Sequence, residues 1–479
     1  MRELAFRLKE SWASVPLAMF LGGALGLALL RVPLRDFLAG VFVLAAALAV
    51  FAWPSLTMGG ALIWLTLQGL IRRLLIPVAG WSSNDPLLLI VPVVVILCCL
   101  QHGAFRRPWN GLTRLMVALC AMLLFESVTP LGAGLRANMV GALFVLIPVL
   151  WFFVGRTVHP NVVRAVLRVL PWAALPVMAY GLWQLLVGLP PWDAAWVQTV
   201  GYAALDLAGH VRPFGTFASS AEYEGFLLCA SAVAFGIAFK SRGLRVPLYL
   251  ALGVVSFIGG FLDGSRTGVV LTVGGIGVLW AYRRPSHRLA RLALTAAGVV
   301  VGYFALVHGH HFQSPATAGS SSATNAVFQH QMQGLTHPLS KKDSTLSVHL
   351  RMMRAGFMSG FHHPLGLGVG VITLAGSRFG SAVVNSEFDV TNMFIAGGVL
   401  GGVTYLAAWL TTLIWALRPP RNVTLERYLL PGLLLGAFGQ WLNGGYYLLS
   451  ALIWLIIGST LGRPDSKTGA ERAVVGQDP

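Results

Sequence analysis

Residues 391–417 read TNMFIAGGVLGGVTYLAAWLTTLIWAL, a run without a single charged side chain. Because a helix needs about 20 predominantly apolar residues to cross a lipid bilayer, this run predicts a membrane-spanning helix. The same character extends over the whole chain of 479 residues, of which 56% are hydrophobic and only 11% are charged. Soluble proteins carry about 25% charged residues. The sequence therefore predicts an all-α, polytopic integral membrane protein.

Outward from this run, further apolar stretches of similar length predict about 12–14 transmembrane helices in all. The first stretch follows a basic opening but has no small-residue cleavage pattern, so we expect an uncleaved span. The stretch 58–76 ends in Ile71-Arg72-Arg73-Leu74 and could instead lie in the membrane interface. The candidate spans lie near 15–31, 37–56, 58–76, 86–101, 112–128, 138–155, 163–189, 222–239, 244–262, 266–282, 289–307, 391–417, 428–444 and 445–462.

The basic residues lie in short clusters between apolar stretches. This pattern argues against a nucleic-acid-binding surface, despite a formal net charge of +17. The loops at 240–245, 283–291 and 418–427 are rich in arginine, so the positive-inside rule predicts that they face the cytoplasm.

Alternation then predicts an outer location for 190–221, 263–265 and 308–390. The chain divides into N-terminal transmembrane helices (1–189), core transmembrane helices (190–307), one large outer loop (308–390), C-terminal transmembrane helices (391–462) and a cytoplasmic tail (463–479).

The large outer loop is rich in histidine. Leu346, Leu350, Met353, Phe357 and Phe361 recur at helical spacing and predict an amphipathic helix. A cluster near residue 310 could suggest zinc, but no third ligand follows at a familiar spacing, so we predict no metal site. Eight of the twelve histidines lie in this loop: His308, His310, His311, His330, His337, His349, His362 and His363.

Two arginines on the predicted outer face are candidate ligands for an anion. Arg212 opens the segment Arg212-Pro-Phe-Gly-Thr-Phe217, and Arg266 lies in Gly264-Ser-Arg-Thr-Gly268. A guanidinium group offers a rigid fork of donors that matches phosphate oxygens, so an anionic lipid headgroup is one candidate ligand. The alternative is interfacial snorkelling, or a salt bridge to Asp263 or Glu222.

The outer loop also offers candidates for binding and proton transfer. Arg351 and Arg354 lie about one turn apart on the amphipathic helix. Glu387 and Asp389 stand just before the next span, where either could take a proton from a hydroxyl nucleophile. A helix-capping role for Asp389 or a solvated carboxylate is the alternative.

The glycines that follow the amphipathic helix, Gly366, Gly368 and Gly370, could let the backbone approach a substrate, or could simply form turns.

Taken in order, these motifs resemble the O-antigen ligase and polysaccharide polymerase family. The resemblance covers roughly residues 200 to 415. It rests on the two arginine segments, on the stretch from Arg351 through His363-Pro-Leu-Gly-Leu-Gly-Val-Gly370, and on a span with Gly398-Val-Leu-Gly401.

This resemblance implies a glycosyltransferase of the bacterial inner membrane, with a large periplasmic loop. Its donor is a glycan on undecaprenyl pyrophosphate, and neither a nucleotide sugar, a metal nor another cofactor is needed. By the resemblance, Arg212 and Arg266 hold the donor pyrophosphate, and Arg351 matches a loop arginine that binds the same substrate. Such contacts would stabilise charge on the leaving group.

One departure from the family concerns the proton acceptor. Ligases of this family place a histidine eleven positions before the first glycine of a Gly-x-x-Gly pair, and here that position is Glu387. Either Glu387 takes the role of base, or His363 does, or the chain belongs to a polymerase-like branch with other acceptor chemistry.

From these residues we expect transfer of a lipid-linked glycan to an acceptor hydroxyl on the periplasmic face. The acceptor could be a growing polysaccharide, lipid A core or a protein. The competing expectation is a non-catalytic transporter, flippase or scaffold subunit that handles the same lipid-linked substrate.

Overall fold

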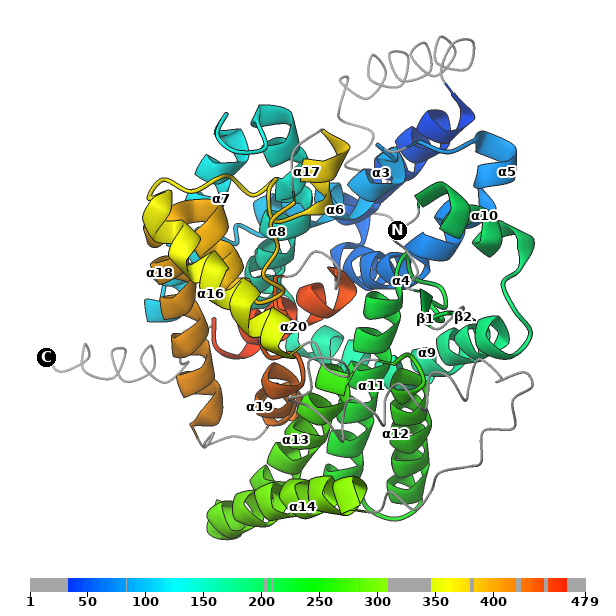
Figure 1. Cartoon of the computed structure of the whole chain (residues 1–479), viewed down its shortest axis with the longest axis vertical. Coiled ribbons are helices and arrows are strands. Elements are labelled where there is room, and N and C mark those ends of the chain that lie inside the picture. The colour runs from blue at the N-terminus through cyan, green and yellow to red at the C-terminus, as the bar shows by residue number, and fades with distance from the viewer. Residues whose placement is uncertain are drawn as a thin grey trace, which may run out of the picture.

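A computed structural model describes residues 33–82, 84–200, 206–207, 210–264, 266–283, 285–308, 346–379, 383–418, 424–442 and 447–462. Over these ranges the chain is helical apart from two short antiparallel strands, β1 (Asp206–Leu207) and β2 (His210–Val211) (Figure 1). The predicted first span (15–31), the segment 309–345 and the tail from residue 463 lie outside the described residues.

The helices of the first half are α3 (Leu34–Ala52), α4 (Pro54–Leu74), α5 (Ile76–Ala79), η1 (Pro86–Leu89), α6 (Ile90–Gln101), α7 (Gly111–Val128), α8 (Leu135–Thr157), α9 (Pro160–Leu186) and α10 (Pro191–Val200). Those of the second half are α11 (Ser220–Lys240), α12 (Arg245–Phe261), α13 (Arg266–Tyr282), η2 (Pro285–His287), α14 (Arg288–His308), α16 (Leu346–His362), α17 (Leu374–Arg378), α18 (Asp389–Leu417), α19 (Leu425–Gly436) and α20 (Tyr447–Thr460).

Within the described ranges, seven helices are long and apolar enough to cross a membrane, which confirms the prediction of an all-helical chain with several spans. They are α3, α4, α7, α8, α9, α11 and α18. Four shorter apolar helices accompany them: η1 with α6 (Pro86–Gln101), α12, α13 and α20.

One predicted span differs from the structure. The stretch 428–444 was expected to cross as one helix, but α19 ends at Gly436. The chain then turns at Gly439, which has a φ of +77°. Asp389 holds the turned segment, because its amide donates to Gly439 O (2.9 Å) and its carboxylate accepts from the amide of Leu442 (2.8 Å). This tertiary contact stops the helix.

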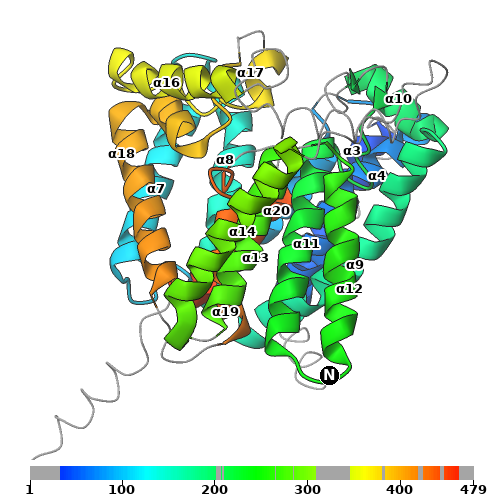
Figure 2. The same ribbon diagram turned by 60° about the horizontal axis from the view of Figure 1, so that its bottom comes forward.

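The arginine-rich loops meet at one end of the bundle. Tyr282 donates from its hydroxyl to Leu417 O (2.7 Å), and the Lys240 ammonium lies 4.9 Å from the ring centre of Tyr428. Figure 2 shows α10, α16 and α17 at the other end of the long helices. The described helices of two loops predicted to share a face therefore lie at the same end, and the described residues of the basic loops lie at the opposite end (Figure 2).

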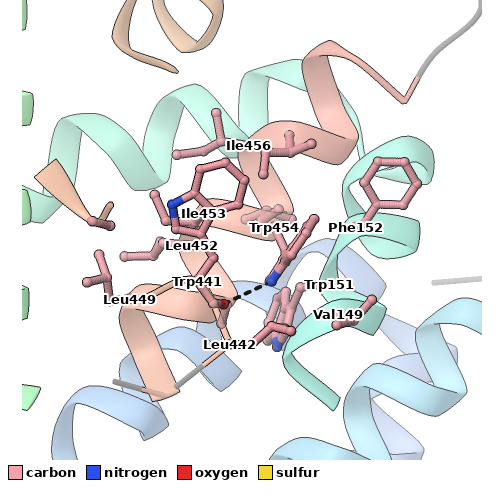
Figure 3. Packing of buried hydrophobic residues seen from close by; sticks show 14 of the residues in the cluster. Val149, Trp151, Phe152, Trp441, Leu442, Leu449, Leu452, Ile453, Trp454 and Ile456 are labelled. Atoms are coloured by element: carbon pink, nitrogen blue, oxygen red, sulfur yellow. Dashed lines mark hydrogen bonds between the residues drawn. The ribbon is translucent and has the colours of Figure 1, made fainter. Parts of the chain in front are cut away.

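The core near the centre is built from aromatic side chains of α8, α20 and the segment before α20. Trp151, Trp441 and Trp454 are wholly buried, and the indole N–H of Trp454 donates to Trp441 O (2.9 Å) (Figure 3). Close approach of α8 and α20 requires glycine, since a Cβ at Gly458 would lie 1.9 Å from Phe152 O. This packing fixes the segment 437–442.

Helix α18 is broken about one third of the way along its length, at Gly397 and Gly398. Gly397 and Gly398 leave helical geometry, with Gly398 at φ +59°. The segment 364–370 fills the break, and the amide of Leu367 donates to Ile395 O (3.0 Å) at the end of the first half of the helix. The break is therefore satisfied by protein backbone, as helix ends require.

The glycines of this segment pack against protein. A Cβ at Gly366 would lie 2.0 Å from Ala396 O, and one at Gly368 would lie 2.3 Å from the side chain of Asn138. Of the two alternatives for these glycines, the structure supports tight turns and packing.

The predicted amphipathic helix is present as α16, which lies across α18. Its inner face carries small residues, and a Cβ at Gly360 would lie 2.7 Å from the ring of Phe394. Its apolar side is exposed and includes Leu350, Phe357 and Phe361. An exposed apolar side of this kind is typical of helices that bind at a membrane interface.

Candidate functional site

Arg212 is paired with Asp263, which lies in the turn between α12 and α13. Its Nε donates to Asp263 O (2.5 Å), and its Nη2 bonds the Asp263 carboxylate. The carboxylate is wholly buried. Burial raises the pKa of Asp263 to about 6, although the neighbouring Arg212 opposes that shift. The salt bridge considered from the sequence is thus present, and it fixes the orientation of the guanidinium group.

The segment that carries Arg212 is held by a second, buried arginine. Arg73 donates from Nη2 to Gly215 O (2.5 Å) and from Nη1 to Phe217 O, and its Nε lies 2.7 Å from the Asp193 carboxylate. Its guanidinium also stacks 4.7 Å from the ring centre of Phe214. Arg73 is wholly buried. These contacts hold the segment 212–217, which begins with Arg212, in one conformation.

Gln184 on α9 also holds this segment in place. Its side-chain oxygen accepts from the amides of Phe214 (3.0 Å) and Gly215 (2.8 Å), and its nitrogen donates to Asp193 (2.6 Å). Gln184 was not singled out from the sequence, and Arg73 was noted only as part of the arginine pair that ends the apolar stretch 58–76. A signal was present for Arg73, since an arginine pair at the end of an apolar stretch is unusual.

Arg266 is the first residue of α13 and follows Asp263 by three positions. The two predicted arginines therefore flank a single turn at the end of the bundle that carries α16 and α17 (Figure 2). The side chain of Arg266 is half-buried.

A cavity of about 100 Å³ begins directly after Arg266, between α11, α13, α19 and α20. Its polar lining comes from Glu224, Thr267, Thr272 and Gln440, and the rest is mainly apolar. Gly268 is required here, because a Cβ would lie 2.2 Å from the Glu224 carboxylate. The cavity is thus lined by residues adjacent to the predicted anion site.

Glu387 is tied to this cavity through Gln440. The side-chain nitrogen of Gln440 donates to Glu387 O (2.6 Å), and the Glu387 amide donates to the side chain of Asn385 (2.6 Å). Among the described residues, Glu387 is the only non-glycine residue with a positive φ, at +59°. Such backbone strain is concentrated at functional sites.

The Glu387 side chain pairs with a histidine that was not weighed as a candidate base. Its Oε2 lies 2.8 Å from His349 Nδ1 on α16. His349 falls in helical register with Gly356 and Gly360, which form the face of α16 that packs on α18. The helical register of His349 was visible in the sequence. Its pairing with Glu387, 38 positions later, was not.

Asp389 has a structural role. It is buried, its carboxylate also accepts from the Tyr405 hydroxyl (3.3 Å), and it anchors the segment 439–442. The structure thus supports a positioning role for this carboxylate over the solvated alternative.

The remaining predicted residues lie apart from Glu387. His363 is exposed just past the end of α16, and fourteen residues at about 1.5 Å each place it about 21 Å along the axis from His349. Arg351 and Arg354 are also exposed, and Arg351 lies on the side of α16 opposite His349.

Over the described ranges, no three His, Cys, Asp or Glu side chains gather closely enough to hold a metal ion. His310 and His311, which prompted the question, lie outside those ranges. Comparisons of the chain with protein-family models, with curated proteins and with solved structures found no match.

Proposed function

We propose that the protein transfers a glycan from an undecaprenyl pyrophosphate-linked donor to an acceptor hydroxyl, at the periplasmic face of a bacterial inner membrane. One observation carries the proposal. The cavity begins directly after Arg266, beside the turn to which Arg212 is bonded. Gln440 lines the same cavity and donates a hydrogen bond to Glu387 O.

The arginines suit the leaving group. A pyrophosphate that departs from the sugar gains negative charge, and guanidinium groups placed beforehand stabilise that charge. The salt bridge to Asp263 holds Arg212 in place before substrate arrives, as does the hydrogen bond from Arg73 to the neighbouring Gly215 O. Preorganisation of this kind lowers the barrier because no groups need to be reoriented during the reaction.

The location supports a lipid-linked donor. The cavity is lined by Leu228, Leu271 and Leu433 at the level of the helices, below the arginines. An isoprenoid chain would remain in the apolar region while its pyrophosphate meets the arginines at the boundary. The opposite, arginine-rich end of the bundle fits the cytoplasmic side by the positive-inside rule.

A transporter or flippase is the second candidate, and the break in α18 is the observation that favours it. Broken helices line the substrate sites of many transporters. Here, however, the segment 364–370 fills the break, with the amide of Gly368 bonded to Ala396 O (2.9 Å). The break therefore offers no passage for a glycan, and we prefer the enzyme.

The test is glycan transfer in proteoliposomes that contain the purified protein and a synthetic undecaprenyl pyrophosphate-linked glycan. Arg266→Ala is expected to lower the turnover number by on the order of 10²–10³, the usual effect of removing one charge-stabilising donor. Arg242→Ala, an exposed arginine at the opposite end, is the matched control and should transfer at the wild-type rate. Equal activity of the Arg266→Ala variant and the wild type would contradict the proposed role of Arg266.

A further inference from the structure

The pair formed by His349 and Glu387 differs from five arginine–carboxylate pairs elsewhere in the described part of the chain. In each of those five pairs the carboxylate is at most 5% exposed. In this pair the histidine is 40% exposed and the glutamate 52%, with Nδ1 and Oε2 2.8 Å apart. An exposed ion pair contributes little to the stability of the fold, so stability does not explain this contact.

The backbone of Glu387 is held at a cost. A left-handed conformation is unfavourable for any residue with a Cβ, by roughly 1–2 kcal/mol. Asn385 and Gln440 fix the peptide groups on either side, and Asn385 is itself held by Asn392 Nδ2 (3.0 Å). Glycine would adopt this conformation freely, whereas Glu387 adopts it with strain.

The histidine is held against the same segment. One face of α16 packs on residues 385–395, and a Cβ at Gly356 would lie 3.1 Å from Ser386 Cβ. His349 precedes Gly356 by two turns on that face. The backbone of both partners is therefore held by neighbouring residues before any substrate binds.

We propose that His349 is the general base that takes the proton of the acceptor hydroxyl, and that Glu387 is a positioning residue. This inference rests on the proposed function and names the proton acceptor for it. It replaces both Glu387 and His363 as the base.

The geometry gives each nitrogen of the imidazole a role. Nδ1–H donates to Glu387 Oε2, which places the lone pair on Nε2. As the acceptor oxygen bonds to the anomeric carbon, its proton passes to Nε2, and the bond from that carbon to the pyrophosphate oxygen breaks with its electron pair. Glu387 stabilises the imidazolium, which then returns its proton to water. Imidazole can gain and lose a proton near neutral pH, as this cycle requires.

The test compares variants in the same proteoliposomes, with the donor alone or with added lipid A core as acceptor. His349→Ala should lower the turnover number by on the order of 10²–10⁴, the usual contribution of a general base. Added imidazole should restore part of that activity. His362→Ala is the matched control, because His362 is exposed at the far end of the same helix, and it should retain wild-type activity.

Glu387 is tested by a variant that keeps its shape. Glu387→Gln can still accept from Nδ1–H but carries no charge, so we expect a lower turnover number with little change in the KM for the acceptor. Elution as a single monodisperse peak in detergent establishes that each variant is folded.

Two results would overturn the inference and leave the proposed function intact. One is wild-type turnover by a folded His349→Ala variant. The other is a loss of turnover that imidazole does not relieve, which would mean that His349 serves in packing. A wild-type protein that releases no undecaprenyl pyrophosphate would instead contradict the proposed function itself.

Discussion

Replacement of Glu387 by glycine or by alanine separates the backbone of this residue from its side chain. Both variants lose the carboxylate, but only glycine adopts a φ of +59° without strain. We expect Glu387→Gly to be more stable than Glu387→Ala by roughly 1 kcal/mol, which is the left-handed penalty less the greater entropy of glycine in the unfolded chain.

The lost pair with His349 does not alter this comparison, because both variants lack it. Its own contribution is small, below about 1 kcal/mol, since both side chains are exposed. The assay is reversible unfolding in mixed detergent micelles, with glycan transfer measured on the same preparations. We expect both variants to lose transfer, although Glu387→Gly should unfold close to the wild type. Equal stability of the two variants, or a more stable alanine variant, would refute the strained backbone and the reasoning built on it.

Two further predictions concern the surroundings of the site. Gly268→Ala would place a Cβ 2.2 Å from the Glu224 carboxylate and should lower transfer by up to on the order of 10²-fold through displacement of the cavity wall. The control is Gly274→Ala on the same helix, where the nearest neighbour of a Cβ would be 3.4 Å away, and this variant should transfer glycan normally. Loss of activity in both variants would mean that any added side-chain volume on α13 disturbs the protein. Arg73→Met would leave the buried Asp193 carboxylate without its cationic partner and should destabilise the fold by about 3–5 kcal/mol. In thermal unfolding, the double variant Arg73→Met with Asp193→Asn should regain part of the lost stability. An Arg73→Met variant as stable as the wild type would contradict the stabilising role of the buried Arg73–Asp193 pair.

Much of the fold could be predicted because apolar length alone determines it. The run 391–417 is α18 in the structure, apart from two residues at its start. The break at Gly397 could not be predicted, since it depends on a partner segment about 30 residues earlier in the chain. For the same reason the end of α19 was missed, because the contact that stops it comes from Asp389.

The candidate site was predicted unevenly. Arg212 and Arg266 stand out because a charge at the end of an apolar stretch needs a reason, and the structure places them around one turn. Arg73 was noted only as a sign of an interfacial helix, because its buried partners Asp193 and Phe217 lie far along the chain. The His349–Glu387 pair joins a helix to a distant loop, so only the three-dimensional structure brings it out.

The most direct measurement is the stoichiometry of lipid pyrophosphate release by the purified wild-type protein in proteoliposomes. Supplied with an undecaprenyl pyrophosphate-linked glycan and an acceptor, the protein should release one undecaprenyl pyrophosphate for each glycan transferred. Movement of the intact lipid-linked glycan between leaflets, without release of the lipid pyrophosphate, would contradict the proposed transfer and identify a transporter.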